Sequence, residues 1–156
     1  MDKSFTPRIL ASLMLALGLL SAVAAPASAK SEINSSFIGS VAIDGTDTVA
    51  YFTEGKAVKG SSGFIHRWKG AAWRFKNAAN RDAFAANPEK YSPQFGGYCA
   101  WAVSRGYTAS IDPEAWKIYR GKLYLNYSKG VQAQWVEDIP GNIAKAESHW
   151  PGVLDN

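Results

Sequence analysis

Residues 64–76 read FIHRWKGAAWRFK, with apolar and polar residues alternating on either side of Lys69-Gly70-Ala71-Ala72. A period of two, with aromatic residues and a glycine-containing turn, is typical of a β-hairpin. Residues 116–127, WKIYRGKLYLNY, alternate in the same way and turn at Arg120-Gly121. We therefore expect two β-hairpins in this chain.

Helix signals follow each hairpin. Asn77 can cap a helix over residues 78–86, and Asn87-Pro88 ends it because proline disfavours helical backbone in the residue before it. Ser128 can cap a helix in which Val131, Trp135, Val136 and Ile139 recur at helical spacing.

The end of the chain predicts one more helix. Pro140-Gly141 should break the preceding helix, and Asn142 can cap another that runs to Trp150. Residues 30–40 carry no periodicity and are expected to be an irregular lead-in. Two hairpins interleaved with short helices predict an α+β fold in a small single domain.

Length and composition agree with one globular domain. The chain has 156 residues, 47% of them hydrophobic, which excludes wholesale disorder. No collagen period, heptad run or repeat of about 20–50 residues is visible, so fibrous and solenoid classes are excluded. The one cysteine excludes an intrachain disulfide framework and any zinc site that needs two thiolates.

The segment from Met1 to Ala29 has the order of a secretory signal peptide. Lys3 and Arg8 precede an apolar run over residues 9–20, and Pro26-Ala27-Ser28-Ala29 offers small residues for cleavage after Ala29. The run is shorter than the roughly 20 residues of a membrane span, and no lipidation cysteine follows it. Because the leader looks bacterial, we expect a periplasmic or secreted domain of residues 30–156, with no membrane contact after cleavage.

Charge argues against a nucleic-acid partner. Cleavage removes two basic residues and one acidic residue, which leaves 15 against 12. These charges are scattered, whereas nucleic-acid binding needs a basic stripe that neutralises several phosphates. Both methionines, Met1 and Met14, also leave with the leader, so the mature chain has no thioether.

Several motifs carry a family resemblance. Asp47-Thr48-Val49-Ala50-Tyr51-Phe52, then Trp73-Arg74-Phe75, then Asn87-Pro88-Glu89-Lys90-Tyr91 resemble the YHS domain. The continuation through Gly96-Gly97-Tyr98-Cys99-Ala100 and residues 111–127 looks like the longer exported bacterial branch of that family. The resemblance covers about residues 41–150.

The resemblance implies an association with metals, because short YHS domains occur in metal-transporting ATPases and carry three cysteines. In this chain Ala50 stands where the first thiol would be, Lys76 and Asn80 stand where the other two would be, and Thr48 replaces a proline. Soft metals such as Cu(I) bind through sulfur. The metal site of the family therefore does not carry over to these positions.

Cys99 and His66 remain as candidate ligands. Cys99 lies among apolar and aromatic neighbours and is either a metal ligand, a reactive thiol, or a buried small residue on a helix that faces the core. His66 shares a strand face with Phe64 and Trp68, and either pairs with Cys99 or hydrogen-bonds to backbone. As a pair they would hold a copper or zinc ion. His149 is expected at the surface.

Signals for catalysis are lacking. Nothing in the spacing brings a base beside Cys99, and no glycine-rich phosphate motif or paired-carboxylate motif is present. Asp112-Pro113-Glu114 is expected to be a turn before a strand. We therefore expect a protein that binds without catalysing, and the sequence carries no signal of its oligomeric state.

The aromatic content is high, with six Trp and seven Tyr. Some of these rings must build the core, while Trp101, Tyr107 and Tyr124 are candidates to line a pocket. Two functions therefore stand side by side. One is a metal-related binding protein that uses Cys99 and His66, and the other is an aromatic-lined module for a small organic ligand or a protein partner.

Overall fold

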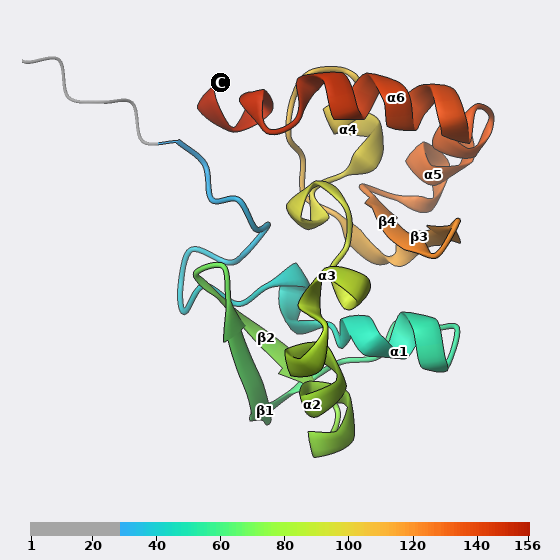
Figure 1. The fold of residues 1–156 in the computed structure, drawn as a ribbon. Helices are drawn as coiled ribbons and strands as arrows, with labels where there is room; N and C mark the ends of the chain where they lie inside the picture. Colours follow the sequence, from blue (N-terminus) through green and yellow to red (C-terminus); the bar gives the residue numbers. More distant parts are fainter. Residues whose placement is uncertain (1–28) are drawn as a thin grey trace, which may run out of the picture.

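The computed structural model describes residues 29–156, so the expected signal peptide lies outside the described residues except for Ala29. Six α-helices and two antiparallel two-stranded sheets form the α+β domain that the sequence predicts (Figure 1). No helix within this range is long and apolar enough to cross a membrane. The elements are η1 (Ile43–Gly45), α1 (Thr48–Thr53), β1 (Ser61–Trp68), β2 (Ala71–Phe75), α2 (Ala78–Ala86), α3 (Pro88–Tyr91), η2 (Phe95–Gly97), α4 (Ala100–Ser104), β3 (Asp112–Tyr119), β4 (Lys122–Asn126), α5 (Lys129–Val136), α6 (Ile139–His149) and η3 (Gly152–Asp155).

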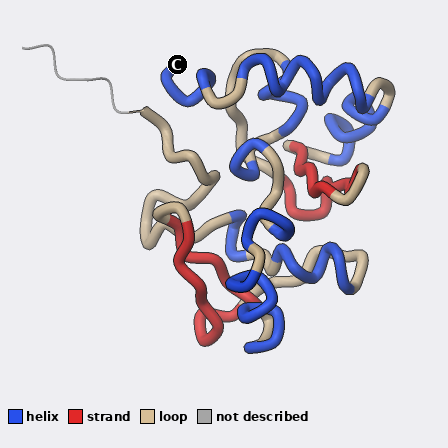
Figure 2. Tube along the Cα trace, in the orientation of Figure 1, coloured by secondary structure: helices blue, strands red, loops and turns tan. Residues whose placement is uncertain are grey.

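These elements form two units of the same order. The first unit runs from η1 through α1, the β1–β2 hairpin, α2 and α3; the second runs from η2 through α4, the β3–β4 hairpin, α5 and α6. Figure 2 shows the two hairpins as separate red segments, each accompanied by blue helices. The chain therefore contains an internal duplication.

The hairpins match residue by residue. In the first, Ser61 pairs with Phe75 and the register then slips before Ile65; in the second, Asp112 pairs with Asn126 and the register slips before Trp116. Asp112 is thus the counterpart of Ser61, and the later hairpin positions correspond at the same offset. The sequence analysis excluded only repeats of about 20–50 residues, and this duplication has a longer period.

Both hairpins turn through two residues with positive φ. Lys69-Gly70 has φ of 48° and 75°, and Arg120-Gly121 has φ of 49° and 75°. This is the conformation of the two-residue turn that matches strand twist, and glycine adopts it without strain. The first turn is tighter than the four residues expected from the sequence, so β2 already begins at Ala71.

The duplication also includes the backbone before each hairpin. Ile43-Asp44-Gly45 and Phe95-Gly96-Gly97 are runs of three positive φ values, at 49°, 52° and 73° and at 55°, 61° and 79°. The second unit is shorter by a single position between this run and its hairpin. Allowing for that deletion, Gly97 is the counterpart of Gly45, and the correspondence continues through the hairpins into the helices that follow them.

The helix caps confirm part of the sequence analysis. Asn77 Oδ1 accepts from Asn80 N–H (2.9 Å) at the start of α2, and Ser128 Oγ accepts from Val131 N–H (3.2 Å) at the start of α5. Both helices have the expected beginnings. Residues 30–40 contain no helix or regular strand, as expected.

The start of the last helix was expected too late in the chain. α6 begins at Ile139, and its cap is Asp138, whose Oδ1 accepts from Gly141 N–H (2.9 Å). Pro140 lies in the first turn, where a missing N–H costs no helical hydrogen bond. Asn142 is buried in the helix and donates from its side chain to the carbonyl of Trp135 (2.9 Å). Asp112-Pro113-Glu114 likewise belongs to β3 and is not a separate turn.

Equivalent aromatic pairs form the interior of each unit. Trp73 of β2 packs on Phe84 of α2 with centroids 4.8 Å apart, and Tyr124 of β4 packs on Trp135 of α5 at 5.1 Å. The units also share apolar packing, because the core cluster that holds Trp73 and Phe84 includes Leu123 of β4. We therefore describe them as two halves of one domain.

Candidate functional site

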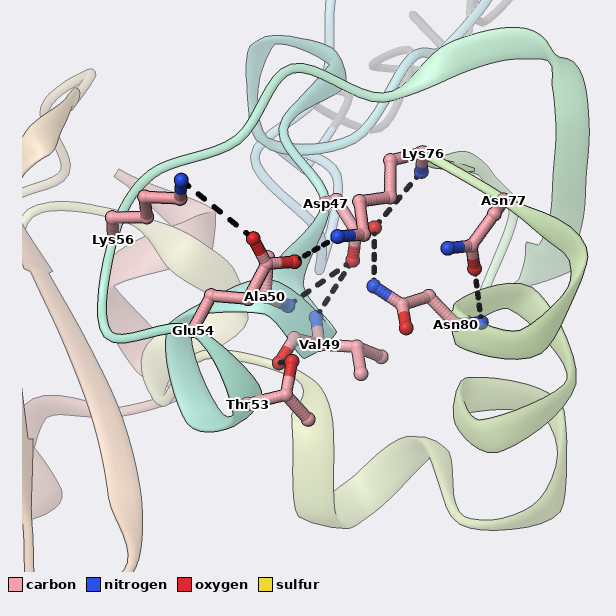
Figure 3. Close-up of polar contacts among 9 residues, drawn as sticks. All are labelled: Asp47, Val49, Ala50, Thr53, Glu54, Lys56, Lys76, Asn77 and Asn80. Carbon is pink, nitrogen blue, oxygen red and sulfur yellow. Dashed lines mark hydrogen bonds and ion pairs between the residues drawn. The ribbon is translucent and has the colours of Figure 1, made fainter.

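The first half holds a buried carboxylate at the start of α1 (Figure 3). Asp47 is fully buried, and its Oδ1 accepts from the N–H groups of Val49 (3.0 Å) and Ala50 (3.3 Å). Its Oδ2 accepts from the N–H of Lys76 (2.9 Å) and from the side-chain amide of Asn80 (2.8 Å). Four donors therefore satisfy this carboxylate.

Charged side chains lie next to the Asp47 carboxylate and its donors. The Lys76 ammonium forms an ion pair with Glu54, and Lys56 lies 3.8 Å from the same carboxylate. The hydrogen bond from Lys76 lowers the pKa of Glu54, and the charges of Lys76 and Lys56 act in the same direction. We call Asp47, Glu54, Lys76 and Asn80 the Asp47 cluster; their polar groups are paired with one another.

The three positions at which the family resemblance implies thiols come together here. Ala50, Lys76 and Asn80 each donate a hydrogen bond to Asp47 (Figure 3). The fold thus gathers residues from α1, from the end of the first hairpin and from α2 around one point. In this half the point is occupied by a carboxylate and its donors.

Cys99 occupies the position of Asp47 in the second half. The sequence predicts Cys99 on a helix, and the structure places it immediately before α4. Its side chain is buried, with 1% exposed. Tyr127 N–H points to Cys99 Sγ (3.2 Å), just as its counterpart Lys76 donates to Asp47. Asn126 Oδ1 lies 3.8 Å from Sγ and accepts from Trp101 N–H (3.2 Å).

Burial keeps this sulfur protonated. Burial raises the pKa of the Cys99 thiol above its ordinary value, and the backbone N–H groups of Ala102, Tyr127 and Trp101 oppose this rise. Since an ordinary thiol has a pKa of about 8.5, Cys99 is a neutral thiol at pH 7. It is the neutral counterpart of the Asp47 carboxylate.

A cavity of about 390 Å³ opens beside the thiol, and we call it the Cys99 cavity. Ala102, Tyr127 and Val131 line it at the positions that Ala50, Lys76 and Asn80 hold in the first half. Tyr107 and Tyr127 are 51% and 56% exposed, so their rings also reach the solvent. The complete lining is Cys99, Trp101, Ala102, Tyr107, Ala109, Tyr127, Val131 and Gln134.

The structure brings together three of the five residues singled out from the sequence. Cys99, Trp101 and Tyr107 line the same cavity. Tyr124 is buried and lines a different hollow, near the β3–β4 turn. The sequence analysis missed Tyr127, although aligning the two hairpins would have placed it at the position equivalent to Lys76.

His66 lies away from this cavity. Its ring packs on Phe84, with centroids 6.0 Å apart, and Figure 1 shows β1 and α4 in opposite parts of the molecule. Residues 29–156 contain no group of three or more His, Cys, Asp or Glu side chains that could hold a metal ion. The lining residues of the Cys99 cavity do not include His66, so the structure gives no support to a copper or zinc site built from this pair. His149 is exposed, as expected, with Nδ1 3.0 Å from the Val103 carbonyl.

The lining of the cavity combines stacking surfaces with a few hydrogen-bonding groups. Three aromatic side chains provide stacking surfaces, and the thiol, two phenol groups and the Gln134 amide provide hydrogen-bonding groups. The lining contains no carboxylate or imidazole that could act as a base toward Cys99. Beside the thiol, the buried Asn126 Nδ2 has no hydrogen-bond partner among the described residues.

Comparison of the chain with protein-family models, curated proteins and solved structures found no match.

Proposed function

We propose that this chain is an exported, YHS-type binding protein that holds a small planar organic ligand in the Cys99 cavity. One observation carries the proposal. The same backbone arrangement occurs twice. At Asp47 it surrounds a polar cluster whose groups are hydrogen-bonded to one another, whereas at Cys99 it surrounds an open, aromatic-lined cavity. Open space among aromatic side chains, with a few polar groups, is the usual composition of a small-molecule site.

The side chains around the cavity favour a flat ligand. Trp101, Tyr107 and Tyr127 present ring faces on which an aromatic or conjugated molecule can stack. The Arg105 guanidinium lies 4.0 Å from the centroid of the Trp101 ring, which holds the indole in place and brings a positive charge next to it. A planar ligand with a weakly polar or anionic edge suits this combination.

The family resemblance supports the same location. The positions that would carry thiols in short YHS domains converge at Asp47 in the first half, and their counterparts Ala102, Tyr127 and Val131 line the cavity in the second. The cavity lining offers one sulfur and no imidazole or carboxylate as a second metal ligand, so organic binding is favoured over metal binding. The order of residues 1–29 supports export, and with it a ligand met in the periplasm or outside the cell.

The test is a screen of planar aromatic fragments against residues 30–156 by protein-observed NMR. The variant Val131→Phe fills the cavity from α5, and Val136→Phe makes the same change at an exposed position of that helix. We expect fragments that shift the resonances of Trp101 and Tyr127, with binding lost in Val131→Phe and kept in Val136→Phe. Binding that survives Val131→Phe, or a screen without any binder at millimolar concentration, would overturn the proposal.

A further inference from the structure

The second half has another open feature, which shares no lining residue with the Cys99 cavity. A hollow of about 260 Å³ lies between the β3–β4 turn and α6. Its walls include Tyr119, Arg120 and Lys122 of the hairpin and Ile143 and Glu147 of α6. We call this the β3–β4 hollow.

The first half has the corresponding feature, but there it is partly occupied. Trp68, Lys69 and Glu89 line a hollow of about 150 Å³ and are the counterparts of Tyr119, Arg120 and Pro140 in the second half. Two further wall residues, Glu32 and Ile33, come from the segment that precedes the first unit. The chain therefore partly covers this face of the first hairpin with its own peptide.

The covering segment binds through one acidic and one apolar side chain. Glu32 Oε1 lies 2.6 Å from Lys69 Nζ, and the adjacent Ile33 is 2% exposed. The next residue, Asn34, donates its N–H to the Gly96 carbonyl (2.8 Å). The segment passes so close to Gly96 that a Cβ there would collide with the Glu32 carbonyl oxygen.

In both halves a basic side chain of the hairpin turn lies over an aromatic ring. Lys69 lies over the Trp68 ring at 4.8 Å, and Arg120 lies over the Tyr119 ring at 5.2 Å. Lys69 is paired with Glu32, whereas no ion pair among residues 29–156 involves Arg120 or Lys122. The chain just before the second unit is α3 of the first half, so it provides no counterpart of Glu32-Ile33.

We propose that the β3–β4 hollow is a docking site for an extended peptide segment of a partner protein, with an acidic residue followed by an apolar one. The carboxylate would pair with Arg120 and Lys122, and the apolar side chain would lie against Tyr124 and Ile143. The hollow of the first half, which Glu32-Ile33 partly covers, is the template for this arrangement. Two basic groups face the single acidic group Glu147, so the charge of the site suits an anionic segment.

The probe is a capped peptide with the sequence of residues 30–36, KSEINSS, titrated into labelled residues 30–156 and followed by NMR. We expect saturable shifts at Tyr119, Tyr124 and Ile143. The affinity should fall about fivefold when the peptide glutamate becomes glutamine, since one partly exposed ion pair contributes about 1 kcal/mol.

Three protein variants make the test specific. Arg120→Asn removes the charge while keeping a residue that tolerates positive φ, and it should weaken binding about as much as the glutamine peptide does. Lys117→Gln removes a charge from the exposed part of the same hairpin and should leave the affinity unchanged. Lys69→Gln should also leave it unchanged, because the peptide is expected to bind without displacing Glu32-Ile33.

Three results would overturn the proposal. These are the absence of saturable shifts, an affinity that Arg120→Asn does not change, and shifts that cluster around Lys69. The first two would mean that the hollow does not select an acidic segment, and the third would mean that the peptide competes with the chain's own segment. None of them depends on whether the Cys99 cavity binds a ligand.

Discussion

The two halves of this domain have the same backbone plan and different interiors at the same place. At the start of its short helix, the first half has Asp47, a carboxylate that accepts four hydrogen bonds under the Lys76–Glu54 ion pair. The second half has Cys99, a neutral thiol beside a cavity of about 390 Å³. The first site is closed by its own side chains, whereas the second has room for another molecule.

The difference indicates a division of roles between the halves. A buried carboxylate with four donors organises α1, the end of the hairpin and α2 into one rigid arrangement. The second half gives up these polar contacts, since Val131 replaces the amide of Asn80 and Tyr127 replaces the ammonium of Lys76. We infer that the first half mainly stabilises the domain and that the second half binds the ligand.

The largest expected effect tests whether the halves fold together. Phe84→Ala and Trp135→Ala each remove a buried aromatic residue at equivalent positions of α2 and α5, and each should cost about 3–5 kcal/mol of unfolding free energy. Because the apolar core continues across both halves, unfolding in urea should remain one transition in either variant. Phe37→Ala, at a fully exposed position, is the control and should change stability by less than about 0.5 kcal/mol. Two separate transitions would contradict the shared core.

The next effect separates the two sites directly. Asp47→Ala leaves four donors without their acceptor and should cost about 3 kcal/mol or more, because each buried unpaired donor costs about 1–3 kcal/mol. Cys99→Ala removes one sulfur atom beside an existing cavity and should cost about 1–2 kcal/mol. Urea unfolding at pH 7 measures both losses of unfolding free energy. Equal losses of unfolding free energy in the two variants would mean that Cys99 contributes as much to stability as Asp47.

A smaller effect concerns pH. The folded pKa of Cys99 is raised, so the unfolded chain loses this proton first as the pH increases. The unfolding free energy should therefore fall as the pH rises above the ordinary thiol value of about 8.5, and Cys99→Ala should abolish this part of the fall. Urea unfolding between pH 7 and pH 10 measures it. Identical pH dependence in the two proteins would show that the thiol pKa is not raised.

The smallest effect concerns the ion pair over Asp47. Lys76 lowers the pKa of Glu54, so the stability from this pair is present above the ordinary carboxyl range and is lost as the pH falls through the lowered pKa. In Lys76→Gln, the NMR titration midpoint of the Glu54 carboxyl should move up toward its ordinary value. Lys56→Gln should move it less, because that ammonium lies 3.8 Å away. Equal shifts in the two variants would contradict the leading role of Lys76.

The fold class was predictable because its signals are local. The alternating stretches, the Arg120-Gly121 turn and the Asn77 and Ser128 caps each act within a few residues, and the structure confirms them. The start of α6 was misjudged because Pro140 was treated as a helix breaker, whereas it lies in the first turn, which tolerates proline. The sequence therefore predicts only those parts of the architecture that depend on residues close together in the chain.

The candidate site was only partly predictable, because it depends on contacts between distant segments. Trp101 and Tyr107 could be proposed from composition, but the contact of Cys99 with Tyr127 spans 28 residues and has no local signature. The pairing of Cys99 with His66 relied only on the presence of both residue types in the chain, and the fold places His66 in β1 and Cys99 directly before α4, in different halves. Aligning the halves at their hairpin turns would have identified Tyr127 and Val131.

The most direct test of the account is a crystal structure of residues 30–156 soaked with planar aromatic fragments. If the second half is the binding half, fragments should lie in the Cys99 cavity against Trp101 and Tyr127, and none should lie beside Asp47. A fragment beside Asp47, or fragments elsewhere while the Cys99 cavity stays empty at saturating concentration, would contradict the division of roles between the two halves.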